Sequence, residues 1–179
     1  MAENNYKAII EALLLISEKP LMIEQVHKVL TELDSLKIRE IFEDLKTGYL
    51  NPNRGIRIIE VAGGFQMVTA PEVSSFLKKF YQKAPEKLTG ATLETLSIIA
   101  YKQPITRMEI EGIRGVDVSF IVKNLTNKGL VRIAGRRKSP GRPFVYATTR
   151  QFLEYFGLKS LQELPKIGEF TKIAEDKKE

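Results

Sequence analysis

The chain has 179 residues, 43% of them hydrophobic, and carries a formal net charge of +6. It contains no cysteine and a single histidine, His27, which excludes disulfides, thiolate chemistry and a histidine metal cluster. The N-terminal residues lack a basic region, and the apolar run at residues 13–16 is too short for a signal segment or a membrane span. We therefore expect a soluble, cytoplasmic protein with no membrane partner.

The first predicted helix covers residues 6–17 and has two apolar sides. At about 100° per residue, one side carries Tyr6, Ile9, Ile10, Leu13 and Leu14. The other side carries Ala8, Ala12 and Leu15. A surface helix needs one apolar stripe to reach its own core, so the second side predicts an interface. Because a unit this small is marginally stable alone, we expect a homodimer formed through this second side.

Two more helices complete the first helical group. Residues 22–32 carry apolar side chains at helical spacing, namely Ile23, Val26, Val29, Leu30 and Leu33. A third helix is predicted from a cap at Asp34 or Ser35 to a stop at Gly48.

A hairpin and a fourth helix follow. Gly63 and Gly64 join two runs of strand-forming residues at 56–61 and 65–69, and glycine accepts the positive φ of a tight turn. A helix is then predicted over residues 71–81, and the polar, proline-containing stretch 84–87 is expected to separate two domains.

The second half predicts the same elements again. A first helix over residues 92–102 has a core stripe of Leu93, Leu96, Ile99 and Ala100. Thr106 and Glu109 have the spacing of a capping box, which predicts the start of a second helix there. Asp117 is expected to cap a third helix, and residues 130–134 and 144–148 to form a second hairpin. A last helix is predicted over 150–156, and residues 171–179 are expected to form a flexible, charged tail.

The two halves are related by an internal repeat. The sequence EALLLISEKP at residues 11–20 returns, with one extra residue, as ETLSIIAYKQP at residues 94–104. Two short helices and a hairpin are predicted after each copy, an order typical of a winged helix. We therefore predict a mainly α fold with small β-hairpins (α+β), built from two tandem winged-helix domains at residues 1–84 and 85–170.

No motif in the chain supports catalysis. A phosphate-binding Walker loop and a GxGxxG fingerprint are both absent, and no pair of carboxylates is singled out for acid–base work. We expect no enzymatic activity, no cofactor and no metal.

The charge distribution bears on whether the partner is DNA or protein. The first 84 residues carry equal numbers of acidic and basic side chains, so the whole excess of +6 lies in the second half. In the first half the third helix presents Glu40, Glu43 and Asp44, which would face phosphates if that helix entered a DNA groove. The tip of the second hairpin carries Arg136, Arg137, Lys138 and Arg142. These cations are expected to contact DNA weakly and without sequence preference, to contact an acidic partner, or only to keep the tip solvated.

The first helix of the second half also has a second stripe, formed by Glu94, Ile98 and Tyr101. This stripe either packs against another part of the chain or provides a site for a partner helix.

Several runs of residues point to a known family. Two of them are LETLSIIAYKQPITR at residues 93–107 and IRGV at residues 113–116. With GRP at 141–143, YATT at 146–149 and GGFQMVT at 63–69, they resemble the family of bacterial segregation and condensation protein B, ScpB. The resemblance implies a homodimer formed through the first domain and a second domain that grips the kleisin ScpA. We expect the stripe of Glu94, Ile98 and Tyr101 to provide the contacts with ScpA.

Through ScpA the chain would join SMC, in a nucleoid-associated complex that condenses and segregates chromosomes during cell division. The family has no catalytic residues to carry over, since ATP hydrolysis belongs to SMC. The alternative is a winged-helix transcriptional regulator that binds DNA through the basic second hairpin.

Overall fold

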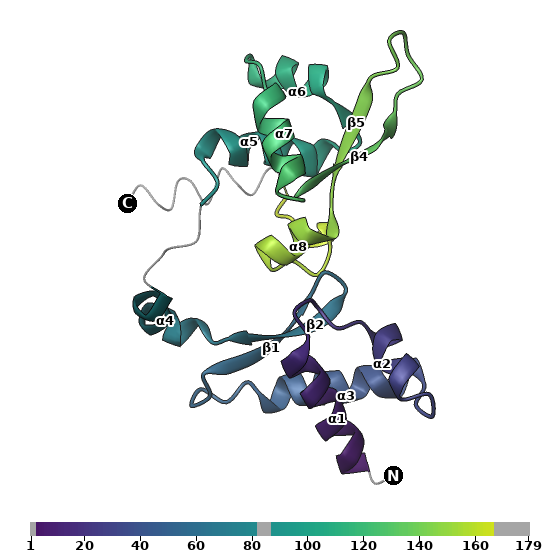
Figure 1. Ribbon diagram of the computed structural model, residues 1–179, viewed down its shortest axis with the longest axis vertical. Coiled ribbons are helices and arrows are strands. Elements are labelled where there is room, and N and C mark those ends of the chain that lie inside the picture. Colours follow the sequence, from purple (N-terminus) through teal and green to yellow (C-terminus); the bar gives the residue numbers. More distant parts are fainter. Residues whose placement is uncertain (1–2, 82–86, 167–179) are drawn as a thin grey trace.

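The structure is a computed structural model that describes residues 3–81 and 87–166 (Figure 1). In its first part, three helices precede a two-stranded antiparallel hairpin and a fourth helix. These elements are α1 (Glu3–Ile16), α2 (Ile23–Val29), α3 (Ser35–Gly48), β1 (Ile56–Val61), β2 (Gly64–Thr69), a 3₁₀ turn η1 (Pro71–Val73) and α4 (Ser74–Tyr81). Their order is the one that the sequence predicts.

The second part repeats this order and adds a short strand. Its elements are α5 (Gly90–Lys102), β3 (Ile105–Thr106), α6 (Arg107–Arg114), α7 (Ser119–Asn127), β4 (Val131–Arg136), β5 (Phe144–Thr148), α8 (Arg150–Phe156) and the 3₁₀ turn η2 (Leu161–Glu163). The three strands lie in the order β3-β5-β4, and both pairs are antiparallel. The predicted class, mainly helical with small hairpins, is confirmed.

Each part packs around a hydrophobic core of its own. In the first core, Ile10 and Leu14 of α1 are fully buried, and Phe42 of α3 stacks on Phe65 of β2 with ring centroids 4.3 Å apart. In the second core, Leu96 and Ile99 of α5 pack among residues from the other elements. Fully burying one such side chain stabilises a fold by about 1.5–3 kcal/mol. The predicted division into domains at residues 84 and 85 stays a prediction. Residues 82–86 at this boundary lie outside the described residues, as does the predicted tail at 171–179.

The two parts meet where α8 and the turn after it approach the first hairpin (Figure 1). The backbone N–H of Ala62 donates to the carbonyl oxygen of Leu158 at 2.8 Å. The Glu60 carboxylate pairs with Lys159 at 3.2 Å and with Arg39 at 3.0 Å. The hydrogen bond from Ala62 and the ion pair of Lys159 with Glu60 thus both cross between the two parts.

Two apolar residues that the sequence analysis placed on the buried sides of helices are exposed in the structure. Val29 is 60% exposed, because α2 ends at this residue and does not continue to residue 32. Leu93 is 39% exposed and does not belong to the buried stripe of α5, where Thr95 is fully buried in its place. The Thr95 hydroxyl can enter the core because it donates to the Ala91 carbonyl oxygen one helical turn earlier, at 3.0 Å.

The predicted capping box at the start of α6 is confirmed. The Glu109 carboxylate accepts hydrogen bonds from the Thr106 backbone N–H and hydroxyl, both at 2.8 Å, and the Glu109 N–H donates to the Thr106 hydroxyl. These bonds from Thr106, with the nearby Arg137, hold the pKa of the Glu109 carboxyl below its usual 4.5.

This capping box makes stability depend on pH. Because the Glu109 pKa is lower in the folded chain, its charge stabilises the fold above pH 4.5, and this contribution is lost as the pH falls through the folded pKa. Glu109→Gln keeps an acceptor for Thr106 but removes the charge. We expect it to destabilise the chain by less than about 1 kcal/mol at pH 7, since the site is exposed. Urea unfolding at several pH values should show this difference shrink as the pH falls below 4.5 and vanish below the folded pKa of Glu109.

Candidate protein-binding surfaces

The outer side of α1 is the first candidate surface. Ala8, Ala12 and Leu15 are all exposed, with Leu15 at 69%. Ile16, which the sequence analysis did not include, is 74% exposed and follows Ala12 by one helical turn. The spacing of four residues could have identified it. The structure therefore gathers four apolar side chains on the side of α1 that faces away from its own core.

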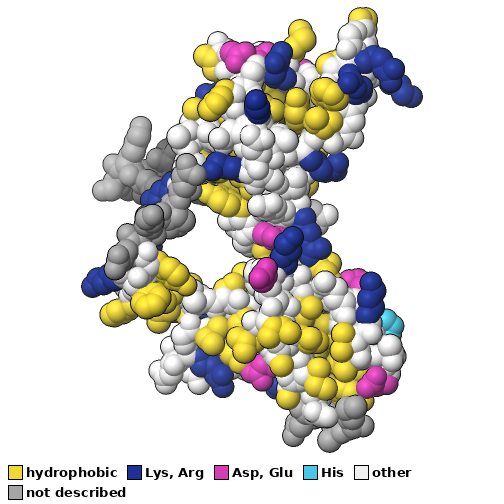
Figure 2. Space-filling view, in the orientation of Figure 1, with side chains coloured by type: hydrophobic (Ala, Val, Ile, Leu, Met, Phe, Trp, Pro, Cys, Tyr) yellow, Lys and Arg dark blue, Asp and Glu magenta, His cyan; other side chains and the backbone are white. Residues whose placement is uncertain are grey.

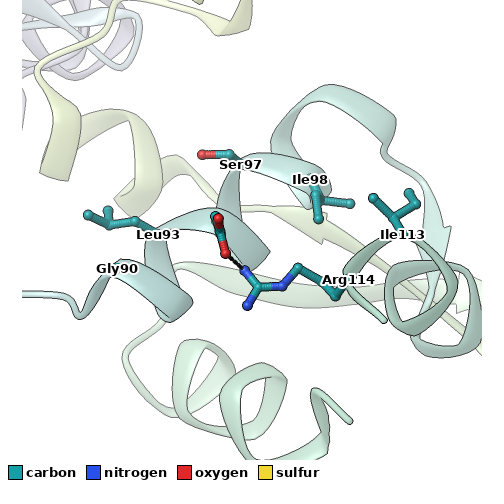
Figure 3. Close-up of a pocket in the computed structure, with 7 residues that line it drawn as sticks. Gly90, Leu93, Ser97, Ile98, Ile113 and Arg114 are labelled. Carbon is teal, nitrogen blue, oxygen red and sulfur yellow. Dashed lines mark hydrogen bonds and ion pairs between the residues drawn. The ribbon is translucent and has the colours of Figure 1, made fainter. Parts of the chain in front are cut away.

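The second candidate surface is a groove between α5 and α6, with a volume of about 590 Å³ (Figure 3). It is lined by Gly90, Leu93, Glu94, Ser97, Ile98, Ile113 and Arg114. Ile98 and Ile113 point toward one another across it. The Glu94 carboxylate pairs with the Arg114 guanidinium, which is mostly buried whereas Glu94 is mostly exposed. The groove thus combines an apolar floor with an ion pair whose carboxylate faces the solvent.

The structure divides the predicted stripe on α5. Glu94 and Ile98 line the groove, but Tyr101 does not. The Tyr101 hydroxyl donates to the Pro165 carbonyl oxygen at 2.6 Å, so this ring holds the segment after η2 against α5. Sequence reasoning missed Ile113 and Arg114, because they come from another helix and meet α5 only through tertiary packing.

The basic tip of the second hairpin is the third candidate surface. The strand β4 extends through Gly135 and Arg136, two residues further than predicted, with an irregularity between Ile133 and Gly135. The Arg136 guanidinium lies 3.9 Å from the ring centroid of Phe144, a cation–π contact. Arg137 pairs with Glu109 of α6. Among the described residues, Lys138 and Arg142 form no ion pair. The four predicted cations are therefore not equivalent, and two are held by the chain itself.

No group of acidic, histidine or cysteine side chains that could hold a metal ion occurs in the part of the chain that the structure describes. His27 is exposed on α2, and its Nδ1 lies 2.8 Å from the Leu33 carbonyl oxygen. No helix among the described residues is both long and apolar enough to span a membrane.

Comparison with known proteins gives the family. Residues 8–167 match the model of the family described as segregation and condensation complex subunit ScpB. The chain is 43% identical over 170 residues to segregation and condensation protein B of Syntrophotalea carbinolica, covering 95% of this chain and 86% of that protein. It is 44% identical over 167 residues to the protein of the same name from Symbiobacterium thermophilum, covering 93% and 76%.

A solved structure described as a dimer of the ScpB N-terminal domain complexed with ScpA peptide is 33% identical, with a TM-score of 0.42. The match covers 45% of this chain and 99% of that chain. On the family model and the curated relatives, the chain belongs to the ScpB family, and the resemblance noted in its sequence is confirmed.

Proposed function

We propose that this chain is a non-enzymatic subunit of an SMC–kleisin complex. It binds the kleisin ScpA and, through it, SMC, and it supports chromosome condensation and segregation in cell division. It works in the cytoplasm at the nucleoid and needs no cofactor. The observation that carries the proposal is membership of the ScpB family across residues 8–167. The exposed apolar surfaces add to it, because such surfaces commonly mark sites of protein association.

We propose that residues 1–84 form a winged-helix domain that dimerises. The support is the outer side of α1, where Leu15 and Ile16 are more than two-thirds exposed although the opposite side of the same helix is buried. Leaving two large aliphatic side chains in water forgoes about 1.5–3 kcal/mol each, which an interface would recover.

We propose that residues 85–170 form a second winged-helix domain that binds ScpA in the groove between α5 and α6. A helical segment of the kleisin would place apolar side chains between Ile98 and Ile113, the usual mode by which an amphipathic helix enters an apolar groove. Glu94, at the groove mouth, would accept hydrogen bonds from the segment. Tyr101 supports this site from beside it, by holding the segment at Pro165.

Co-expression of the full chain with ScpA from the same genome tests the function. We expect the two proteins to elute together in size-exclusion chromatography, with a mass by light scattering that contains two copies of this chain. Separate elution at micromolar concentrations would contradict the proposal. The mass would also give the stoichiometry directly.

Binding to duplex DNA separates this function from the regulator alternative. Each phosphate contact contributes about −0.9 to the slope of log affinity against log salt, so the unpaired Lys138 and Arg142 predict about −1.8, whereas all four tip cations would give about −3.6. We expect weak binding with the shallower slope and equal competition by shuffled duplexes, measured by fluorescence anisotropy. Lys138→Ala with Arg142→Ala should abolish the binding. Nanomolar, sequence-dependent binding would favour the regulator.

A further inference from the structure

A fourth surface lies where α6 and α7 begin and the second hairpin passes beside them. We call it the wing face and define it by the apolar residues Met108, Phe120 and Phe144 and by the basic residues around them, Lys123, Arg136, Lys138 and Arg142. Met108 is 72% exposed, Phe120 78% and Phe144 40%. Figure 2 shows hydrophobic side chains at the base of the hairpin and basic side chains along it.

Contacts within the chain bring these residues together. The Arg107 guanidinium donates to the Ser119 hydroxyl at 2.8 Å, which places the first turn of α6 beside the first turn of α7. A hollow of about 280 Å³ continues this surface to the hairpin, and it is lined by Arg107, Met108, Pro143, Phe144 and Tyr146. The hollow joins Met108 to Phe144, and the bond between Arg107 and Ser119 brings the start of α7, which carries Phe120, near the start of α6. The wing face is distinct from the groove. The groove uses Ile113 and Arg114 at the C-terminal end of α6, whereas the wing face uses Met108 at its N-terminal end.

The charge on this face is unbalanced. Within the described parts of the chain, Lys123, Lys138 and Arg142 form no ion pair. Arg136 stacks on the Phe144 ring, but no carboxylate neutralises its charge. The carboxylates nearby are engaged: Glu111 pairs with Arg107 at 3.5 Å, and Asp117 accepts from the N–H and the hydroxyl of Ser119 at 3.0 Å. Basic side chains thus remain available around an apolar centre.

A helix-turn-helix protein that reads DNA uses the start of its last helix to contact base edges, which requires hydrogen-bonding side chains there. This chain has Phe120 in the first turn of α7 and Met108 in the first turn of α6. Neither side chain can donate to a base edge or a phosphate. Aromatic residues, Met and Arg are instead the types enriched at protein–protein interfaces, and Met adapts its shape to a partner.

We propose that the wing face binds an acidic protein segment that carries aromatic or aliphatic side chains. The apolar side chains of the segment pack on Met108, Phe120 and Phe144, and its carboxylates pair with Arg136, Lys138, Arg142 and Lys123. Charge complementarity selects this partner: the face offers unpaired cations around an apolar centre, and a segment of the opposite charge satisfies both features. The proposal is independent of the ScpA groove, because the two surfaces share no lining residue.

Selection from a phage-displayed library of random peptides of about 16 residues, roughly four helical turns, tests the proposal on the full chain. The library is counter-selected on a Met108→Ser, Phe120→Ser variant. We expect the enriched peptides to combine acidic with aromatic or aliphatic residues. By fluorescence anisotropy, their affinity should fall about tenfold or more in the double variant, and also in Arg136→Gln, Arg142→Gln. A matched control, Leu36→Ser with Leu50→Ser, removes two apolar side chains elsewhere that are also more than 60% exposed, and it should leave the affinity unchanged.

Four binding results would overturn the proposal. They are an absence of enriched peptides, enriched peptides without acidic residues, equal binding to the double variant, and duplex binding near physiological salt that depends on Phe120. The last would make the face a DNA wedge site. A change of mass by light scattering in the double variant would assign the face to an interface between copies of the chain and would equally refute the acidic partner. Because Met108 and Phe120 are exposed, the double variant should melt within a few degrees of wild type, so loss of binding is not loss of fold.

Discussion

Leu15→Glu should convert a dimer of the wild-type chain into a folded monomer. Leu15 lies on the side of α1 that faces away from the core, and it is 69% exposed in the single chain. In the monomer a glutamate there stays in water and costs little. In the proposed dimer the same carboxylate would be buried without a partner, which costs about 3 kcal/mol or more and weakens association by roughly two orders of magnitude. Light scattering at micromolar concentration measures the change.

The matched control is Leu36→Glu, which adds the same charge at a side chain of α3 that is 75% exposed. It should leave the mass unchanged. A wild-type chain that is already monomeric at micromolar concentration would contradict the proposed dimer. Loss of helical circular dichroism in Leu15→Glu would show that Leu15 supports the fold of the single chain, and the change of mass would then say nothing about an interface.

Short-range patterns explain why much of the fold could be predicted. The buried side of α1 follows from a helical repeat, and Ile10 and Leu14 are indeed fully buried. The capping box at Thr106 and Glu109 follows from a spacing of three residues, and the turn at Gly63 from a need for positive φ, observed at 75°. Each feature depends on residues within about one helical turn, where the sequence carries the information directly.

Contacts between distant residues explain what the sequence could not show. The groove needs Ile113 and Arg114 of α6 opposite Ile98 of α5, and no local pattern links the two helices in this way. The pair between Arg137 and Glu109 joins the hairpin tip to α6 across the fold, and it removes one cation from the predicted basic patch. Thr95 is buried in the second core where the sequence analysis expected Leu93. The Thr95 hydroxyl finds a hydrogen-bond acceptor within its own helix, so this polar side chain can be buried. A search for the periodicity of hydrophobic residues does not detect such a position.

Truncating the groove floor should weaken the binding of ScpA strongly. We expect Leu93→Ala with Ile98→Ala to reduce the affinity by about 2 kcal/mol or more, roughly thirtyfold, because apolar anchors in a groove dominate such interfaces. Isothermal titration calorimetry of the full chain with ScpA measures it. Ile98 also packs against the second core, so its truncation alone lowers stability. Leu93→Ala, at an exposed position, should weaken binding without a comparable loss in the melting temperature.

Tyr101→Phe provides the sharper comparison within the same helix. It keeps the ring and removes the hydroxyl that donates to Pro165, so it tests the supporting contact apart from the groove floor. If Tyr101 acts by holding the segment after η2, the phenylalanine variant should lose about 1 kcal/mol of stability and little affinity, since one neutral hydrogen bond contributes that much. If affinity falls as far as in the groove variant, ScpA contacts the tyrosine hydroxyl or the segment it holds, and the binding site extends beyond the groove. If neither variant changes affinity, the proposed groove site is wrong and ScpA binds another surface of the chain.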